Sequence, residues 1–282
     1  MKYVPGDAVG GATMPETKDF ILTDIRKWRD VIKAPDISGI DWEAMAKKDM
    51  ENVNREESVV ELMTHVGYFQ HLMEFMGFTE GLTAMYEEPE EVMALFEYLA
   101  DFYDAVYKKA VEYYKPDVFC ILDDTATAKN PFISLDMYRE MVKPYHARLG
   151  KIAQDAGLFI NMHDCGRCED FIEDWFDFGV SIWNPAQTMN DLVGIKKKYG
   201  NKLSWAAGTP PVHLLGPVLL RSLYGARCAN VSTHLHPAAA SASGAVYTAP
   251  WATLRWNKKP SGWPMSMRHM AEAGIRITDN SV

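Results

Sequence analysis

The clearest hydrophobic pattern in the chain lies between residues 89 and 114. Large apolar side chains recur there at spacings of three and four, as on one face of an amphipathic helix; they are Val92, Leu95, Phe96, Leu99, Phe102, Tyr103 and Val106. Pro89 suits the first helical position, and the carboxylates of Glu90 and Glu91 suit the positive end of the helix dipole. The pattern predicts a long helix with one buried face.

Short apolar runs alternate with helical stretches along most of the chain. The apolar runs predict buried strands at 116–124, 158–163, 180–186 and 202–208, with an earlier candidate in 58–69 that ends near Thr64 to Gly67. Helices are predicted after Asp41, from Ser134 to Gly157 with a kink at Pro144, over 167–178 up to Gly179, and over 188–199 up to Gly200. Strands that alternate with helices over short loops imply parallel crossovers. We expect an α/β fold and favour a (β/α)₈ barrel, although an open sheet also fits.

Polar side chains follow the predicted strands. In a parallel barrel, functional groups lie at the C-terminal ends of the strands. Those ends carry Asp123 and Asp124, then His163, Asp164 and Cys165, then Asn184 and Gln187, and finally Gly208. Because core packing alone does not require polar groups at successive strand ends, we expect these residues to gather at one rim.

The segment 161–171, NMHDCGRCEDF, combines a histidine with two cysteines. Thiolate and imidazole are ligands that Zn²⁺ prefers, and residues i and i+2 of an extended segment point to the same side. His163 and Cys165 are therefore candidate metal ligands, and Cys168 is a further candidate where a helix begins. The alternative is a histidine bonded to backbone beside a small buried cysteine.

The other candidate site residues have weaker signals. Asp123 and Asp124 point to opposite sides, so we expect one of them to face the rim as a catalytic group; adjacent acids at such a position also serve as helix caps. Asn184 and Gln187 are candidate substrate-binding residues, although Asn-Pro is also a common turn. Tyr68 is a third candidate for substrate binding.

Composition narrows the class of protein. The chain has 282 residues, a formal charge of −9, 48% hydrophobic residues and four cysteines. The charge argues against non-specific nucleic-acid binding, and no apolar run is long enough for a membrane span. Without a secretory signal at the start, four cysteines in a long chain indicate reduced thiols rather than a disulfide framework. We expect a cytoplasmic protein.

Three segments together resemble the uroporphyrinogen decarboxylase superfamily. They are PDVFCILDD with PFISLDMYREMVKPYHARLGK, then FINMHDCG, then GVSIWNPAQTMNDLVGIKKKYGNKLSWAAG, within a similarity that covers roughly residues 20–208. The chain looks like the corrinoid-linked methyltransferase branch, the relatives of methylcobamide:coenzyme M methyltransferase, which carries His-x-Cys-Gly as two zinc ligands. His163, Cys165 and Gly166 match that motif.

The resemblance implies a fold, cofactors and a reaction. The family fold is a (β/α)₈ barrel, of which the first strand is expected to be missing here. The branch uses Zn²⁺ to activate a thiol that attacks a methyl group on a corrinoid, which a partner protein carries. A different acceptor, such as a folate, or a methoxy-compound donor also occurs. The decarboxylases proper lack the motif and use an arginine-bearing N-terminal segment, which is not found before Lys18.

The sequence departs from the family after Gly208. All but two of the 38 acidic residues lie before Thr209, and no segment resembles the family's Ile-Asp-Thr-x-Ala-Pro-Gly-Gly-Gly-Phe or the late strand that supplies a third zinc ligand. Codons for residues 231–241 can be chosen so that, in the reading frame that starts one base earlier, they encode that family segment. We infer a barrel domain over 1–208 and an out-of-frame tail over 209–282.

Three functions therefore stay open on the sequence. The first is zinc-dependent methyl transfer between a methylcorrinoid or methylated donor and a thiol or other acceptor. The second is decarboxylation of a tetrapyrrole. The third is an inactive, corrinoid-binding member. Zinc content distinguishes the first from the second, and turnover distinguishes both from the third.

Overall fold

A computed structural model describes residues 20–56, 58–64 and 67–205 of this chain. It also gives the backbone of three short strands, β1 (Tyr3–Pro5), β2 (Thr13–Pro15) and β8 (Tyr247–Thr248). The predicted strand end at Gly208 lies outside the described residues. So does the tail inferred over 209–282, apart from β8.

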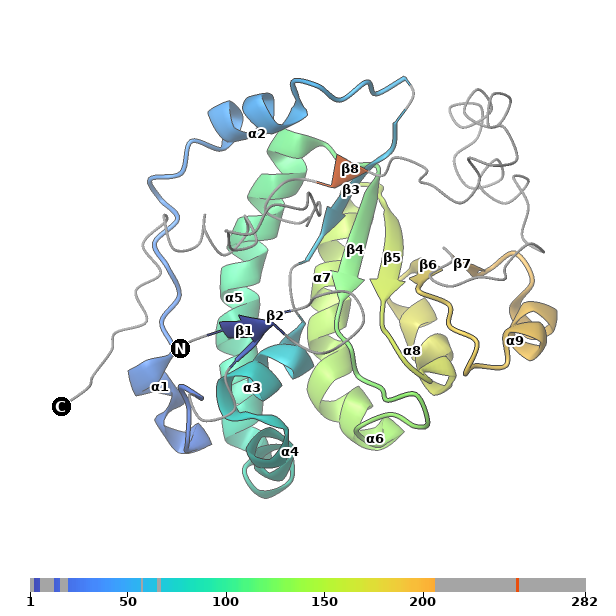
Figure 1. Ribbon diagram of the computed structural model, residues 1–282. Coiled ribbons are helices and arrows are strands. Elements are labelled where there is room, and N and C mark those ends of the chain that lie inside the picture. The colour runs from blue at the N-terminus through green and yellow to red at the C-terminus, as the bar shows by residue number, and fades with distance from the viewer. Residues whose placement is uncertain are drawn as a thin grey trace.

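The centre of the fold is a parallel sheet whose strands pair in the order of the chain. The strands are β3 (Val60–Met63), β4 (Val118–Leu122), β5 (Phe159–His163), β6 (Val180–Asn184) and β7 (Ser204–Trp205). Each pairs in parallel with the next, and β8 pairs in parallel with β3. Figure 1 shows the arrows of β3, β4 and β5 side by side and pointing toward one edge. The predicted parallel βα alternation is confirmed.

Helices precede the first of these strands and connect successive strands from β3 to β7. Before β4 come α1 (Trp28–Val31), α2 (Trp42–Met50), α3 (Tyr68–Met76), α4 (Phe78–Glu87) and α5 (Pro89–Tyr114). After β4 come α6 (Leu135–Met137), α7 (Lys143–Asp155), α8 (Ile172–Asp177) and α9 (Leu192–Tyr199). Short 3₁₀ turns at Ile25–Lys27 and Glu169–Phe171 precede α1 and α8, and a π-helical turn at Tyr138–Val142 precedes α7.

Single residues determine where several helices begin or end. Asp41 accepts a hydrogen bond from Ala44 N at the start of α2, and Ser134 accepts one from Met137 N at the start of α6. Gly179 and Gly200 adopt positive φ angles after α8 and α9, where a residue with a side chain is strained. The helix predicted from Ser134 is divided into α6, the π turn and α7, where Pro144 cannot donate a backbone hydrogen bond.

The two faces of the sheet differ in polarity. One face packs against the helices, with α7 in contact with β4 and β5, and its buried side chains are Leu62, Phe119, Ile121, Met162 and Trp183. The register places Met63, Cys120 and Asn161 together on the opposite face, where Asn161 Nδ2 donates to Glu61 Oε1 at 2.7 Å. A parallel sheet that winds in one direction, with its helices on one face, has the geometry of an arc of a (β/α) barrel.

Candidate metal centre

The C-terminal ends of three strands lie at the same edge of the sheet. Leu122 of β4 pairs with His163 of β5, and His163 pairs with Asn184 of β6. Asp124 follows β4 by two residues, and Cys165 follows β5 by two. The topology therefore brings the strand ends that carry Asp124, His163, Cys165 and Asn184 to one edge, and Gly208 is not described.

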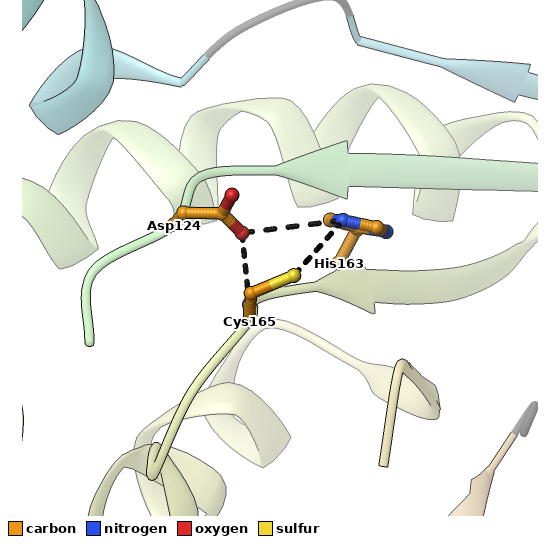
Figure 2. A group of neighbouring side chains, drawn as sticks. All are labelled: Asp124, His163 and Cys165. Carbon is orange, nitrogen blue, oxygen red and sulfur yellow. Dashed lines mark hydrogen bonds and ion pairs between the residues drawn. The ribbon is translucent and has the colours of Figure 1, made fainter. Parts of the chain in front are cut away.

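Asp124, His163 and Cys165 form a compact group at this edge, shown in Figure 2. One potential ligand atom from each lies within 4.8 Å of the others. His163 Nε2 is 3.7 Å from Cys165 Sγ and 3.9 Å from Asp124 Oδ1. Asp124 Oδ1 also accepts a hydrogen bond of 2.8 Å from the backbone nitrogen of Cys165. The carboxylate thus fixes the chain where it leaves β5.

Burial and charge keep both ligand candidates neutral. Burial, and then the negative charge of Asp124, raise the pKa of the Cys165 thiol to about 12. Burial lowers the pKa of His163 below its usual value, and the Asp124 charge opposes this effect. A neutral imidazole can bind a metal directly, whereas the thiol must first release its proton.

The donor set and the spacing suit a zinc ion. Zinc lies roughly 2.3 Å from sulfur and 2.0–2.1 Å from imidazole nitrogen, so tetrahedral ligands of these types are about 3.6 Å apart. The 3.7 Å between Cys165 Sγ and His163 Nε2 agrees with that value. Nε2 is the nitrogen of His163 that faces the group, and Nδ1 is buried with no hydrogen-bond partner within the described residues.

Asp123 does not face the group. Its side chain is fully buried, and its carboxylate accepts hydrogen bonds of 3.0 Å from the backbone nitrogens of Phe69 and Gln70 and lies 3.0 Å from His146 Nε2. It therefore serves as a partner for the N-terminus of α3, on the side of the sheet covered by helices. Asp124 is the member of the acidic pair that lies at the rim.

The second cysteine is not part of this group, and its role as a ligand stays a prediction. Cys168 is fully buried, and its thiol lies 3.4 Å from the carbonyl oxygen of Asp164 and 3.7 Å from that of Gly166. Gly166, at φ +102°, turns the chain between the two cysteines. A Cβ at Gly166 would lie 2.6 Å from the carbonyl oxygens of Ala126 and Thr127, so the turn requires glycine.

The three predicted substrate-binding residues have different environments. Tyr68 is fully buried in the core among the rings of Phe96, Tyr103 and Tyr145, and its contact with substrate stays a prediction. The first turn of α3 directs it inward. Gln187 accepts a hydrogen bond of 2.6 Å from Gly166 N, which supports the loop after β5.

Asn184 is half-buried at the end of β6, next to His163 in register. Its predicted contact with substrate stays a prediction. One side chain near the group was missed by sequence reasoning. It is Gln70, whose Nε2 donates to Asp124 Oδ2 at 3.4 Å. Asp164, which the sequence placed at the rim, accepts hydrogen bonds from Thr125 N and Oγ1 at 2.9 and 2.6 Å. The sequence analysis predicted no helix beginning directly after Gly67. Such a prediction would have put Gln70 in the first turn of a helix at the rim.

Comparison with known proteins assigns the family. The model of the uroporphyrinogen decarboxylase (URO-D) family matches residues 36–218. The chain belongs to this family. The match confirms the superfamily resemblance found in the sequence, and with the parallel sheet it identifies the fold as part of a barrel of the URO-D type.

Other comparisons add less about this URO-D chain. No curated protein matches it. A solved methyltransferase from Methanosarcina mazei matches with 17% identity and a TM-score of 0.47, over 63% of this chain and 51% of that one. The chain thus spans about half the length of that protein. Within the described residues, no helix has the length and apolar character that crossing a membrane requires.

Proposed function

We propose that this URO-D family chain is a zinc-dependent methyltransferase. It would move a methyl group between a methylcorrinoid, or another methylated donor, and a thiol or other acceptor. The observation that carries the proposal is the 3.7 Å approach of His163 Nε2 to Cys165 Sγ at the C-terminal end of β5. Cysteine and histidine two residues apart and followed by glycine are the ligand pair of the methyltransferase branch that the sequence resembles.

The residues at this site would have separate roles. His163 Nε2 and Cys165 Sγ would hold the ion, and Asp124 Oδ1, which lies beside both, would supply the third ligand or orient a water molecule there. Bound zinc would lower the pKa of a thiol acceptor and so supply a nucleophile at neutral pH. Asn184 stands beside His163, where its amide could contact the acceptor.

The corrinoid enters the proposal as a methyl carrier on a partner protein. The support is the resemblance to the corrinoid-linked branch, together with a rim that presents three potential ligands at one edge of the sheet. Each group is half-buried, so a ligand at this edge can reach the side chains while protein surrounds the rest of them. An inactive, corrinoid-binding member would share this surface and lack turnover.

Tetrapyrrole decarboxylation is the second candidate function. The observation that favours it is the family match, because the matching family is described by that activity. The two candidates differ in what they require of Cys165. Methyl transfer of the proposed kind needs its sulfur as a ligand, whereas decarboxylation by the resembling enzymes proceeds without this motif.

Metal analysis of purified protein tests the proposal. We expect wild-type protein to bind about one zinc ion per chain and Cys165→Ala to lose stoichiometric zinc. The matched control is Cys168→Ala, which removes a thiol three residues away that points to backbone carbonyls. It should keep its zinc. Methyl transfer from methylcobalamin to a small thiol, followed by cobalamin absorbance, then tests turnover.

Three results would count against methyl transfer. A wild-type protein without zinc, even after reconstitution, contradicts the metal centre and favours the decarboxylase alternative. Equal zinc in wild type and Cys165→Ala shows that the ion binds elsewhere. Zinc without turnover, for any thiol or folate acceptor tested, supports the inactive corrinoid-binding member instead.

A further inference from the structure

We propose that Gln70 is a positioning residue of the metal centre. Its side-chain amide holds the carboxylate of Asp124 within the group, and the buried pair of Asp123 and His146 holds Gln70 through the N-terminus of α3. The inference rests on the proposed function only for the identity of the bound ion. The contacts themselves belong to the protein alone.

The first step is at Asp124, whose two carboxylate oxygens have separate partners. Oδ1 accepts from Cys165 N at 2.8 Å and lies 3.9 Å from His163 Nε2. Oδ2 accepts from Gln70 Nε2 in a long hydrogen bond of 3.4 Å. Rotation about the last bond of an aspartate is otherwise soft. The donor on Oδ2 therefore helps to determine that Oδ1 is the oxygen presented to histidine and cysteine.

The second step concerns the contacts that hold Gln70 in place. Asp123 Oδ1 accepts from Gln70 N, and Asp123 Oδ2 accepts from Phe69 N, both at 3.0 Å. Asp123 Oδ2 is also 3.0 Å from His146 Nε2, and Tyr138 Oη is 3.1 Å from His146 Nδ1. Asp123, Tyr138 and His146 are fully buried, so this network is shielded from water and strongly directional.

The third step is the close approach of the chain before α3. A Cβ at Gly67 would lie 2.0–2.4 Å from carboxyl-group atoms of Asp123. Only glycine therefore lets the backbone reach Asp123 closely enough for both amide hydrogen bonds. The start of α3 is fixed on one side by this contact, and Gln70 projects from its first turn toward Asp124.

The fourth step concerns the other end of the Gln70 amide. Its Oε1 atom is buried and accepts no hydrogen bond from the described residues. A buried acceptor without a partner costs free energy, and an apolar side chain of the same shape would avoid that cost. Packing alone does not account for glutamine at this position. The hydrogen bond from Gln70 Nε2 to Asp124 accounts for glutamine at this position.

The experiment compares Gln70→Met and Gln70→Glu with the control Gln154→Met. Methionine keeps the length and helix propensity of glutamine without its donor, and glutamate turns the same shape into a like charge facing Asp124. Gln154 is exposed on α7. Zinc affinity is measured by chelator competition, and the Cys165 backbone amide is followed by NMR in metal-free protein. Circular dichroism reports the folded state of each variant.

We expect both Gln70 variants to bind zinc about 10- to 100-fold more weakly than wild type, the usual effect of losing a group that supports a metal ligand. The Cys165 amide should shift and exchange faster in metal-free protein, because Asp124 Oδ1 no longer holds it. Gln154→Met should match wild type in both readouts. If Gln70→Met does not fold, Gln70→Glu gives the same comparison.

The two readouts separate the two proposals. An unmoved Cys165 amide in the folded Gln70 variants overturns the positioning role, whatever their zinc affinity, and leaves the proposed function standing. A Cys165 amide that moves in the Gln70 variants, in a protein whose wild type binds no zinc, supports the positioning role and rejects the proposed function.

Discussion

Asp123 and Asp124 are neighbours in the sequence and have different environments in the structure. The side chain of Asp123 is fully buried beneath the helices, whereas that of Asp124 is 33% exposed at the rim. Alternation along an extended segment predicts that the two differ. It does not predict which one faces the rim, because that depends on the side of the sheet that the helices cover. The same limit applies to Cys165 and Cys168, whose separation depends on the turn at Gly166.

Glu74 on α3 gives a prediction about stability and pH. Burial, and then the negative charge of Asp123, raise the pKa of Glu74 to about 7. Because this folded-state pKa lies above the unfolded value, the folded state holds the proton more tightly, and stability falls as pH rises from about 4.5 through 7. Glu74→Gln should therefore stabilise the protein at pH 8, by up to about 3 kcal/mol, and have little effect at pH 4.5.

Urea unfolding of wild type and Glu74→Gln at the two pH values measures this effect. The difference between the proteins is the relevant quantity, since other groups titrate in both. Glu80→Gln, on the exposed surface of α4, is the control for a neutralised glutamate. An equal gain from Glu74→Gln at both pH values would show that packing, rather than ionisation, is responsible.

The helices differ in how strongly the local sequence encodes them. The helix predicted over 89–114 is α5 with the same bounds, because proline, two acids and a long apolar stripe all mark it. Helices α3 and α4 were not predicted as separate elements. Both begin after a glycine that offers no capping side chain, and the group that caps α3 is Asp123, far along the chain. That signal exists only in the folded protein.

Gly67→Ala should therefore disturb α3 more than an ordinary glycine substitution. The added methyl group would meet the Asp123 carboxyl group, so the protein must move α3 away from its cap or strain the network with His146. We expect a loss of about 2–4 kcal/mol in the free energy of unfolding, which combines overpacking with weakened backbone hydrogen bonds. Chemical denaturation measures it.

Gly39→Ala is the matched control, because a Cβ there meets nothing within 4 Å. It should change the free energy of unfolding by less than about 1 kcal/mol. A similar loss from both substitutions would point to a general effect of the added Cβ, because the lower entropy of the unfolded chain after Gly→Ala stabilises a protein. The close approach to Asp123 would then not be the cause.

At the scale of the whole molecule, the order of elements was easier to predict than the set of side chains at the site. Alternating strand and helix patterns imply a parallel sheet, and the comparison assigned the same family as the motifs in the sequence. The motif identified His163 and Cys165 as neighbours, and topology added Asp124. The burial of Tyr68 was not predicted, because the orientation of its side chain depends on where α3 begins. Sequence patterns in a single chain do not determine such contacts.

The inferred change of reading frame gives a prediction about the gene. We expect a single-base insertion or deletion near codon 209, because only two acidic residues follow it and codons for residues 231–241 can encode a family-like segment in another frame. Sequencing the gene from its source across codons 200–245 checks this. An unbroken frame that matches the present sequence would contradict it. A repaired chain should hold zinc more tightly, because the resembling enzymes take a third ligand from a late strand.

The pairing of β4 with β5 also determines when the group of Asp124, His163 and Cys165 can form. Asp124, His163 and Cys165 come from the ends of two adjacent strands, β4 and β5, which pair directly. A chain that folds while it is being synthesised can pair these strands once residue 165 and the segments that cover them have left the ribosome. Loop closure between β4 and β5 spans only one connecting unit, so its entropic cost is modest. We therefore expect these three side chains to come together before the last strands are made.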